Sequence, residues 1–217
     1  MVQRSVVVFA GGERAPDSLP TLPADAFVVA ADSGVDFALA LGVRIDVAIG
    51  DFDSVSPDGL EHARAAGARI ETHPAAKDKT DLELALDEAI QHGATELIVL
   101  GVGGGRLDHL LANLLVLTSP RYAPCRITAH AGTARVHVVR GGEAVNALEG
   151  AVGETVTLVP VGGPAIGITT DGLEYPLQHE SLAPGTSRGV SNVVTASPVK
   201  VGLDDGTVLV VFPGEEL

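Results

Sequence analysis

The chain has 217 residues, of which 46% are hydrophobic and 19% charged, so it is able to bury a core and is not disordered throughout. The formal net charge of −14 argues against non-specific binding to nucleic acid or to an anionic membrane, and no apolar run approaches the ~20 residues that span a bilayer. The single cysteine, Cys125, excludes an internal disulfide and a thiolate zinc site, and it fits a reducing cytoplasm.

Short apolar runs and longer Ala/Leu-rich segments alternate in the first part of the chain. The first run, residues 6–10, is shorter than the core of a signal peptide and indicates a buried strand. The apolar runs do not alternate with polar residues, which is typical of a parallel sheet covered on both faces. Because strands and helices alternate along the chain, the sequence predicts a doubly wound α/β domain, with a mostly parallel sheet and flanking helices, over residues 1–133. Further strands are predicted at residues 27–31, 45–49, 96–100 and 126–130, and helices at residues 34–41, 57–66, 81–92 and 107–117.

The remaining residues, 134–217, lack a good helical stretch. Short strands are predicted at residues 136–139, 155–160, 165–169 and 207–212, separated by turns rich in Gly, Pro and Asp. This pattern predicts a smaller all-β domain, built as an antiparallel sandwich or a barrel.

Polar loops follow four of the predicted strands of the α/β domain. Asp32 follows the second strand, and Asp51 and Asp53 follow the third. Segment 77–81 follows a further strand, for which the sequence defines no bounds, and the glycine-rich segment 101–109 follows the strand predicted at residues 96–100. Ligands of open parallel sheets bind outside the carboxyl ends of the strands, so these loops are expected to share one functional rim.

The residue types on this rim favour a metal–polyphosphate ligand. Clustered carboxylates repel one another unless a cation lies among them, and oxygen ligands without Cys or paired His point to a hard metal, usually Mg²⁺. Two of the chain's three lysines, Lys77 and Lys79, lie inside the acidic rim, and Arg106 ends the run of glycines. Such a mixture suits Mg²⁺ bridging carboxylates and phosphates, with cations and backbone N–H groups on the remaining oxygens.

Each feature also has a purely structural explanation. Asp51 and Asp53 are common turn residues, Thr80 caps a helix start, and glycines 101–105 form a tight strand-to-helix turn. That turn is neither a P-loop nor a clean dinucleotide fingerprint, and His109 alone is typical of a helix start. The functional interpretation depends on the occurrence of all these features at one rim.

At these residues the sequence resembles the thiamine pyrophosphokinase (thiamine diphosphokinase) family. The matching blocks occur in order over nearly the whole chain; each is short, and together they are specific. They are Ala31-Asp32-Ser33-Gly34, Gly50-Asp51-Phe52-Asp53-Ser54, Lys77-Asp78-Lys79-Thr80-Asp81-Leu82-Glu83, Gly104-Gly105-Arg106-Leu107-Asp108-His109, Thr170-Asp171-Gly172-Leu173-Glu174-Tyr175-Pro176-Leu177 and Thr186-Ser187-Arg188-Gly189-Val190-Ser191-Asn192.

The resemblance implies an N-terminal α/β domain that binds ATP and Mg²⁺, over residues 1–133, and a C-terminal β-sandwich that binds thiamine, over residues 134–217. It also implies a homodimer with the active site at the subunit interface. The implied reaction converts ATP and thiamine to AMP and thiamine diphosphate. In this reaction the hydroxyethyl oxygen of thiamine attacks the β-phosphorus of ATP, and no residue stands out as a general base.

The resemblance further assigns roles to individual residues. Catalytic roles fall on Asp51, Asp53, Asp78, Asp81 and Arg106, and these four aspartates are the implied Mg²⁺ ligands. Contacts to ATP or its phosphates are implied for Asp32, Lys77, Thr80, Gly104, Gly105, Arg106, Asp108 and His109. Thiamine contacts are implied for Tyr175, Ser187, Ser191 and Asn192, with Tyr175 either stacking on thiamine or packing in the sandwich.

Three other functions stay open at this point. A pyrophosphokinase acting on another alcohol, such as a hydroxymethyl pterin, would share the acidic rim and differ in the β-domain. A Mg²⁺-dependent phosphohydrolase or an ordinary kinase would release phosphate or ADP in place of AMP. A non-catalytic nucleotide or thiamine sensor would bind without turnover, and it would be expected to lack rim acids that this sequence contains.

Overall fold

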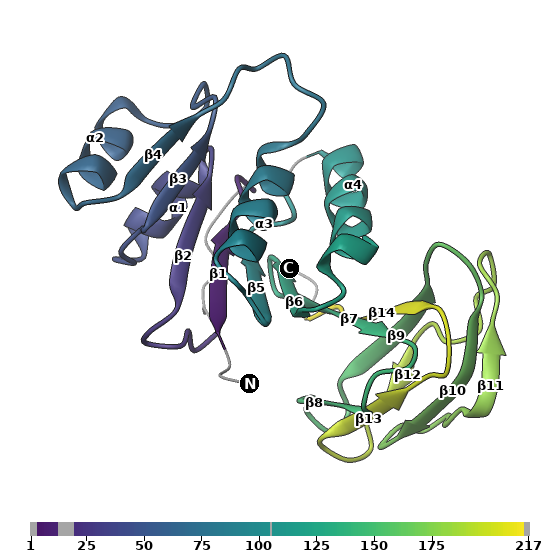
Figure 1. The fold of residues 1–217 in the computed structure, drawn as a ribbon. Helices are drawn as coiled ribbons and strands as arrows, with labels where there is room; N and C mark the ends of the chain where they lie inside the picture. Colours follow the sequence, from purple (N-terminus) through teal and green to yellow (C-terminus); the bar gives the residue numbers. More distant parts are fainter. Residues whose placement is uncertain (1–3, 13–19, 105, 215–217) are drawn as a thin grey trace. The chain divides into compact units, whose positions relative to one another are not determined.

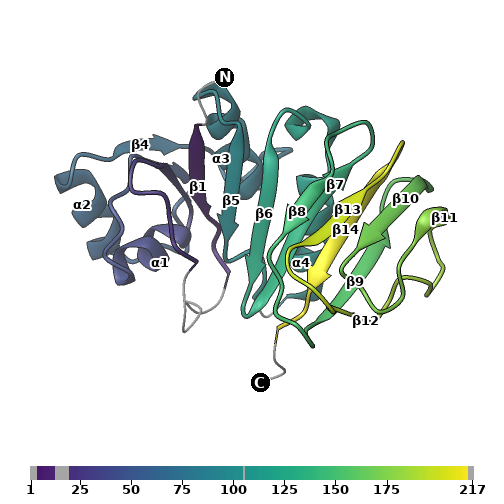
Figure 2. The ribbon, with the colours of Figure 1, turned by 90° about the horizontal axis from the view of Figure 1, so that it is seen from below.

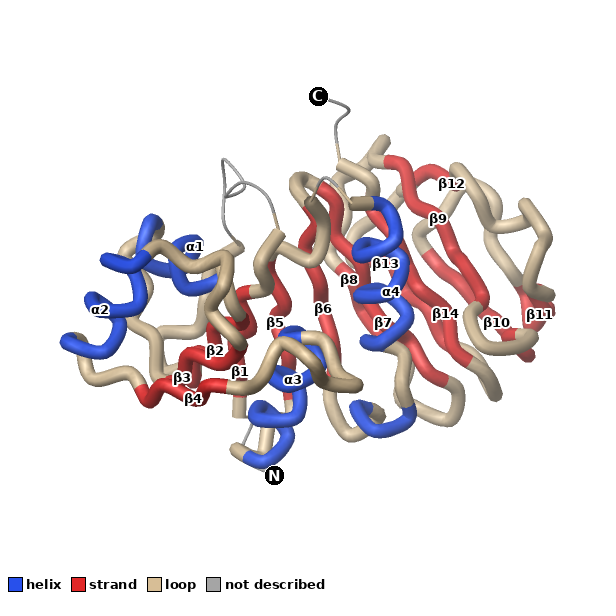
Figure 3. Tube along the Cα trace, turned by 90° about the horizontal axis from the view of Figure 1, so that it is seen from above, coloured by secondary structure: helices blue, strands red, loops and turns tan. Residues whose placement is uncertain are grey.

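The computed structural model describes residues 4–12, 20–104 and 106–214, and the chain divides into two compact units (Figure 1). The first unit is Met1–Gly132 and the second is Thr133–Leu217. The boundary expected from the sequence lies between residues 133 and 134. Figure 3 shows the helices of the described residues in blue, and all of them belong to the first unit.

The first unit is built on a six-stranded sheet in which every neighbouring pair is parallel. The strands lie in the order β6-β5-β1-β2-β3-β4, and Figure 2 shows β1, β5 and β6 next to one another. Most residues of the central strands are buried, as expected for strands covered on both faces. The bounds are β1 Ser5–Phe9, β2 Phe27–Ala31, β3 Val47–Gly50, β4 Arg69–Thr72, β5 Glu96–Leu100 and β6 Arg126–Ala131.

Helices connect these strands and begin at recognisable caps. The Ser56 hydroxyl accepts a hydrogen bond from the Gly59 N–H at the start of α2, and the Thr80 hydroxyl accepts one from the Glu83 N–H at the start of α3. Figure 1 shows α1 behind the sheet and α3 in front of it. The bounds are α1 Gly34–Ala40, α2 Pro57–Ala65, α3 Asp81–Gln91 and α4 Leu107–Leu117, with a short 3₁₀ helix, η1, at Pro120–Tyr122.

The strand order reverses beside β1, and this reversal locates the site. From β1 the chain moves outward through β2, β3 and β4, and then returns across the sheet to place β5 on the other side of β1. Right-handed crossovers put helices on opposite faces when the direction changes. The carboxyl ends of β1 and β5 therefore diverge into the crevice where open α/β sheets bind ligands.

The second unit contains two antiparallel sheets. One has the order β12-β9-β14-β7 and the other β11-β10-β13-β8. Buried residues of both sheets, among them Val156, Ile168 and Phe212, form one hydrophobic cluster between them, which defines a sandwich rather than a barrel. The bounds are β7 Ala134–Arg140, β8 Asn146–Leu148, β9 Thr155–Pro160, β10 Ala165–Asp171, β11 Gln178–Leu182, β12 Asn192–Val193, β13 Val199–Gly202 and β14 Thr207–Phe212.

The predicted fold class is confirmed: a mostly parallel α/β unit is followed by a smaller all-β sandwich. The strands predicted at residues 27–31, 96–100, 155–160 and 207–212 and the helix at 107–117 match at both ends. The sequence analysis missed β8, β11, β12 and β13, which are short and lie among turns, and it gave no bounds for β4. No helix among the described residues is long and apolar enough to cross a membrane.

Packing between the sheets of the sandwich gives the first prediction. Val156→Ala removes two methyl groups from a fully buried site, and we expect it to lower the free energy of unfolding by about 2 kcal/mol. The matched control is Val152→Ala, because Val152 is 72% exposed and its truncation should change stability little. Urea unfolding followed by circular dichroism compares them, and equal effects of the two substitutions would contradict the assignment of this core.

Candidate functional site

A cleft of about 510 Å³ opens at the carboxyl ends of the parallel strands. Segments that follow β1, β2, β3, β4 and β5 all reach it, as the topology requires. Lys79 lines this strand-end cleft, and so do eight of the residues to which the resemblance assigns roles: Asp32, Asp51, Lys77, Thr80, Asp81, Gly104, Arg106 and His109.

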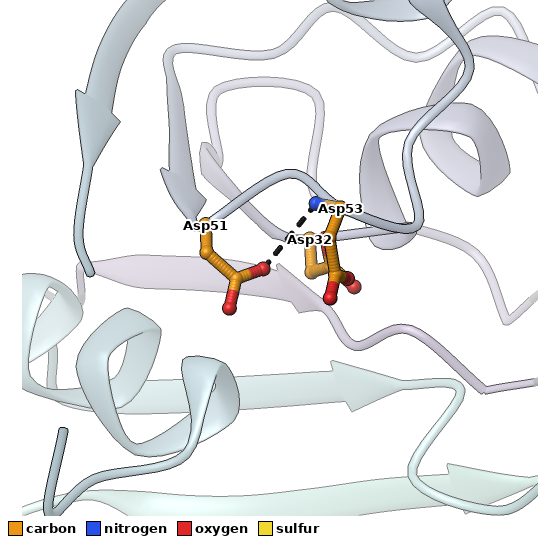
Figure 4. Close-up of side chains that lie close together, drawn as sticks. All are labelled: Asp32, Asp51 and Asp53. Carbon is orange, nitrogen blue, oxygen red and sulfur yellow. Dashed lines mark hydrogen bonds between the residues drawn. The ribbon is translucent and has the colours of Figure 1, made fainter. Parts of the chain in front are cut away.

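Three carboxylates gather at this cleft and form what we call the carboxylate trio: Asp32, Asp51 and Asp53. One ligand-capable oxygen from each lies within 4.8 Å of the others, and Figure 4 shows the side chains next to one another. Asp32 comes from the end of β2, and Asp51 and Asp53 come from the loop after β3, where the Asp53 N–H donates a hydrogen bond of 3.3 Å to Asp51 Oδ1. The trio could hold a hard divalent cation, which prefers carboxylate oxygens.

Backbone conformation brings the trio together. Asp32 has φ +46° and Phe52 has φ +62°, both in the left-handed region that non-glycine residues seldom adopt. The Phe52 side chain packs against the hydrophobic core of the first unit, and this contact anchors the loop between Asp51 and Asp53. Strained residues of this kind persist where the surrounding structure fixes them, often at functional sites.

The trio is electrostatically unfavourable without a cation. Burial raises the pKa of Asp32 above its ordinary value of 3.8, a hydrogen bond from the Ser33 backbone partly offsets this, and the charges of Asp81, Asp53 and Asp51 raise the pKa further. Asp32 Oδ1 is also buried and accepts no hydrogen bond within the described structure. A buried anionic oxygen with no partner is the feature that a bound cation would satisfy.

Two lysines line the cleft and face different carboxylates. Lys77 Nζ lies 3.0 Å from Asp81 Oδ1 and 3.5 Å from Asp51 Oδ2. Burial lowers the pKa of Lys77, but hydrogen bonds and charges from Asp81 and Asp51 outweigh it and raise the pKa overall, so Lys77 stays cationic. Lys79 points instead to Asp87 of α3, with 2.5 Å between Nζ and Oδ2.

Glycines form the opposite wall of the cleft, at the switch point. A Cβ atom on Gly12, which follows β1, would lie 1.9 Å from the carbonyl oxygen of Gly103, which follows β5, so only glycine fits there. The same wall continues through Gly104 to Arg106, whose guanidinium pairs with Asp108 at 2.5 Å and lowers the pKa of that exposed carboxyl to about 2. Gly105, implied as a phosphate contact, lies outside the described residues.

The carboxylate trio shares Asp51 and Asp53 with the four implied Mg²⁺ ligands. Asp78 is exposed and is not among the residues that line the cleft, and the same is true of Asp53. Asp78 differs from Asp53 because it lies outside the group of carboxylates whose oxygens come within 4.8 Å of one another. Asp32, implied as an ATP contact, also belongs to the trio. Asp81 lies beside the trio and pairs with Lys77. Asp108 also does not line the cleft.

Some cleft residues were missed in the sequence. Gly11 and Gly12 follow β1 directly, and the same strand-end rule that found the other loops would have found them. Asn113 of α4 also lines the cleft, and its side-chain amide donates a 3.0 Å hydrogen bond to the Val102 carbonyl. A single asparagine within an apolar helix carries no signal of such a position.

A second pocket, of about 230 Å³, lies within the sandwich unit. Tyr175, Ser187 and Asn192, three residues implied as thiamine contacts, line it together with apolar side chains such as Leu158 and Val190. The Tyr175 side chain is 64% exposed, so it does not pack in the sandwich core and its ring is available at the pocket rim.

The buried Asn192 side chain fixes the backbone of Tyr175. Its Oδ1 accepts a 3.0 Å hydrogen bond from the Tyr175 N–H, and its Nδ2 donates a 2.8 Å hydrogen bond to the Tyr175 carbonyl. Asn192 therefore shapes the rim that carries the aromatic ring. Ser191 does not line the pocket; it is exposed, with φ +56°, and its N–H donates to the Thr157 hydroxyl at 3.0 Å.

Two family models match the chain. One describes the catalytic domain of thiamin pyrophosphokinase and matches residues 21–129, and the other describes the vitamin B1 binding domain of thiamin pyrophosphokinase and matches residues 144–208. The first model therefore covers the strand-end cleft except Ala10, Gly11 and Gly12, and the second covers the pocket of the sandwich unit.

Individual relatives agree with these models. The thiamine pyrophosphokinase of Bacillus subtilis (strain 168) is 25% identical over 191 residues, covering 87% of this chain and 89% of that protein. Thiamine pyrophosphokinase 1 of Oryza sativa subsp. japonica is 28% identical over 171 residues, covering 75% of this chain and 64% of that longer protein. The crystal structure of a thiamin pyrophosphokinase family protein from Enterococcus faecalis superposes with a TM-score of 0.82 at 27% identity, covering 99% of this chain and all of that one.

The raised pKa of Asp32 gives the second prediction. An acid whose pKa is raised by folding destabilises the fold while it is ionised, and this penalty vanishes as the pH falls through the folded pKa toward 3.8. In EDTA, Asp32→Asn should therefore raise the melting temperature at about pH 7.5, and this increase should become smaller toward about pH 4. Asn also tolerates φ +46°, but that contribution does not depend on pH.

Thermal melts across this pH range measure the effect. The control is Asp25→Asn, which neutralises an exposed aspartate outside the strand-end cleft. A gain that stayed constant with pH would mean that relief of backbone strain, rather than of charge repulsion, is the cause.

Proposed function

This chain belongs to the thiamine pyrophosphokinase family, and from that premise we propose that it transfers the diphosphoryl group of ATP to the hydroxyethyl oxygen of thiamine. The products are AMP and thiamine diphosphate. The observation that carries this proposal is the carboxylate trio with its unpaired Asp32 Oδ1. Two of its members, Asp32 and Asp51, line the same cleft as Lys77 and Arg106. A separate pocket for the alcohol substrate lies in the unit that matches the vitamin B1 binding model.

The residues present fit Mg²⁺. Asp32, Asp51 and Asp53 offer only carboxylate oxygens, and the buried oxygen of Asp32 lacks the partner that a hard cation would supply. We propose that these three residues hold the ion, with Asp81 beside them and the exposed Asp78 outside the set. When bound, Mg²⁺ would neutralise negative charge on the phosphates of ATP.

The side chains of the chain itself bind and orient the phosphates. Lys77 and Arg106 supply positive charge on two sides of the cleft, and the glycine segment leading into α4 leaves room for phosphates against the backbone N–H groups. Transfer forms a bond from the thiamine oxygen to the β-phosphorus and breaks the bond from that phosphorus to the oxygen of AMP. Catalysis of such a step consists mainly of alignment and of charge neutralisation, since no covalent intermediate is required.

We propose that thiamine binds in the pocket of the sandwich unit, with Tyr175 stacking on its rings and Ser187 beside them. The exposed aromatic ring at the rim supports stacking, and the amide of Asn192 keeps the Tyr175 backbone in place. Thiamine is a cation, so the net charge of −14 attracts it, whereas ATP depends on the local cations of the cleft.

We further propose that the chain forms a homodimer. Leu107, Leu111 and Leu115 follow one another at helical spacing along α4, and each is more than half exposed. A continuous leucine stripe on one helix face is typical of a surface that another subunit covers. Tyr175 and Val190, also exposed, leave the rim of the thiamine pocket open for a residue of the partner.

A cytoplasmic location is the remaining proposal. Its support is the single thiol of Cys125, which is buried and has no second cysteine with which to form an internal disulfide. Chains of the secretory compartments more often carry paired cysteines.

The third prediction is a product assay. Purified protein with ATP, Mg²⁺ and thiamine should give AMP and thiamine diphosphate, followed by phosphorus NMR, and neither product should form in EDTA or without thiamine. Asp51→Asn should lower turnover by a factor of about 100 or more because it removes a carboxylate of the trio. Its circular dichroism should remain that of the parent.

Each other product pattern identifies a different function. If AMP forms only with a hydroxymethyl pterin, diphosphoryl transfer in the cleft would be supported and thiamine would be excluded as the acceptor. ADP or free phosphate would indicate an ordinary kinase or a phosphohydrolase. Binding of ATP and thiamine without turnover would indicate a sensor.

The fourth prediction concerns the leucine stripe on α4. Size-exclusion chromatography with light scattering should give about twice the 22.1 kDa mass of the chain. Leu111→Glu combined with Leu115→Glu should shift the mass to that of a monomer, because charges would replace apolar side chains in the interface. The control, Ala65→Glu, adds a single negative charge on the exposed side of α2 and should stay dimeric. If the stripe is not the interface, each single glutamate variant that keeps the rest of the stripe should also stay dimeric. A monomeric parent protein would contradict the homodimer.

A further inference from the structure

A second charged cluster lies next to the strand-end cleft, centred on Asp87 of α3. This carboxylate is only 6% exposed, which is rare for an aspartate unless it is paired. Lys79 Nζ lies 2.5 Å from its Oδ2, and Arg121 Nε lies 2.7 Å from its Oδ1. The Tyr122 hydroxyl donates to Oδ1 as well, at 3.2 Å. One buried carboxylate therefore holds two cations and one hydroxyl.

The cluster joins three separate parts of the first unit. Lys79 comes from the loop before α3, Asp87 from the middle of that helix, and Arg121 and Tyr122 from η1. Tyr122 is almost completely buried, and burial together with the negative charge of Asp87 raises the pKa of its hydroxyl, so it remains a donor. The carboxylate is thus fixed from one side before any ligand binds.

Lys79 has capacity for a further partner. Its side chain is 36% exposed, and it lines the strand-end cleft together with Lys77. An ammonium group has three N–H donors, of which Asp87 takes one, while Glu83 Oε1 lies at 3.9 Å. A lysine on an exposed loop loses side-chain conformational entropy when it binds a ligand. Because the ion pair with Asp87 already restricts the Lys79 side chain, less entropy is lost when a ligand binds.

The second cation makes this arrangement suitable for ligand binding. A phosphate that takes one of the remaining N–H donors of Lys79 leaves its contact with Asp87 in place, and Arg121 and Tyr122 keep that buried carboxylate fixed. Lys77, in contrast, is bound to Asp81 and Asp51 on the side of the carboxylate trio. The two lysines are therefore oriented toward different parts of a metal–polyphosphate ligand.

We propose that Asp87 is a positioning residue that holds Lys79 as a phosphate-binding cation of the cleft. This inference rests on the proposed function, since it assumes that the cleft accepts a polyphosphate. Lys79 contacts the phosphates, and Asp87 acts only through Lys79.

The fifth prediction tests this by calorimetric titration with ATP in Mg²⁺ and, separately, with AMP. Lys79→Met should weaken ATP binding about tenfold, the equivalent of ~1.4 kcal/mol, and leave AMP binding within about twofold. Lys79→Arg should restore most of the affinity for ATP. Asp87→Asn should weaken ATP binding in the same direction by a smaller factor. The matched control is Lys200→Met, which removes a lysine of the sandwich unit with its own ion pair to Asp171 and should not change either affinity.

The double variant separates positioning from folding. If Asp87 acts through Lys79, Lys79→Met/Asp87→Asn should bind ATP no more weakly than Lys79→Met alone. A further loss in the double variant, or an equal loss for AMP, would mean that Asp87 merely supports the fold and would overturn the proposal. Unchanged ATP affinity in Lys79→Met would overturn it as well. If Asp87→Asn fails to fold, Asp87→Glu replaces it in the same titrations, because it keeps the negative charge and moves it by one methylene.

Failure of the proposed function gives a different result. A parent protein that binds ATP but does not form thiamine diphosphate would refute the reaction, while the titrations would still decide the role of Lys79. A parent protein that does not bind ATP at all would overturn both.

Discussion

Repulsion between carboxylates at one edge of the parallel sheet is the constraint on which the organisation of the cleft depends. Parallel strands deliver their following loops to the same rim, and in this chain those loops are acidic. Asp32, Asp51 and Asp53 stay within 4.8 Å of one another because left-handed backbone at Asp32 and Phe52 turns them together and the Phe52 ring anchors their loop in the core. Without a cation this arrangement costs free energy, which the rest of the unit must supply.

The cations of the cleft each offset the negative charge of a nearby carboxylate. Lys77, Lys79 and Arg106 each rest on a carboxylate of the protein in the absence of ligand. A metal–polyphosphate ligand can therefore bring partners of both signs: its metal meets the carboxylates of the trio, and its phosphates meet the N–H donors that the ammonium and guanidinium groups keep beyond their own ion pairs. The ion pairs of the protein stay in place in this arrangement, so binding need not leave a buried charge without a partner.

Much of this could be predicted from the sequence, because hydrophobic runs and strand-end loops are local signals. Such signals predicted the strand at Phe27–Ala31 and the helix at Leu107–Leu117. They also predicted that a sandwich follows an α/β unit. The relation between side chains is not local. Asp78 and Asp81 belong to one short motif, yet only Asp81 faces the cleft, and the direction of each side chain depends on a loop conformation that no pattern specifies. The burial of Asp87 depends on Tyr122, which lies 35 residues further along the chain.

The hydrophobic interiors of the two units have a consequence for how the chain melts. The cluster between β1, β2, β3 and the neighbouring helices shares no residue with the cluster inside the sandwich. Because cooperative unfolding extends as far as a continuous core does, two calorimetric transitions are expected for the intact chain. A ligand confined to the strand-end cleft would shift one transition and leave the other in place. The heat-capacity trace of the intact chain would then report, without any label, which unit a given small molecule occupies.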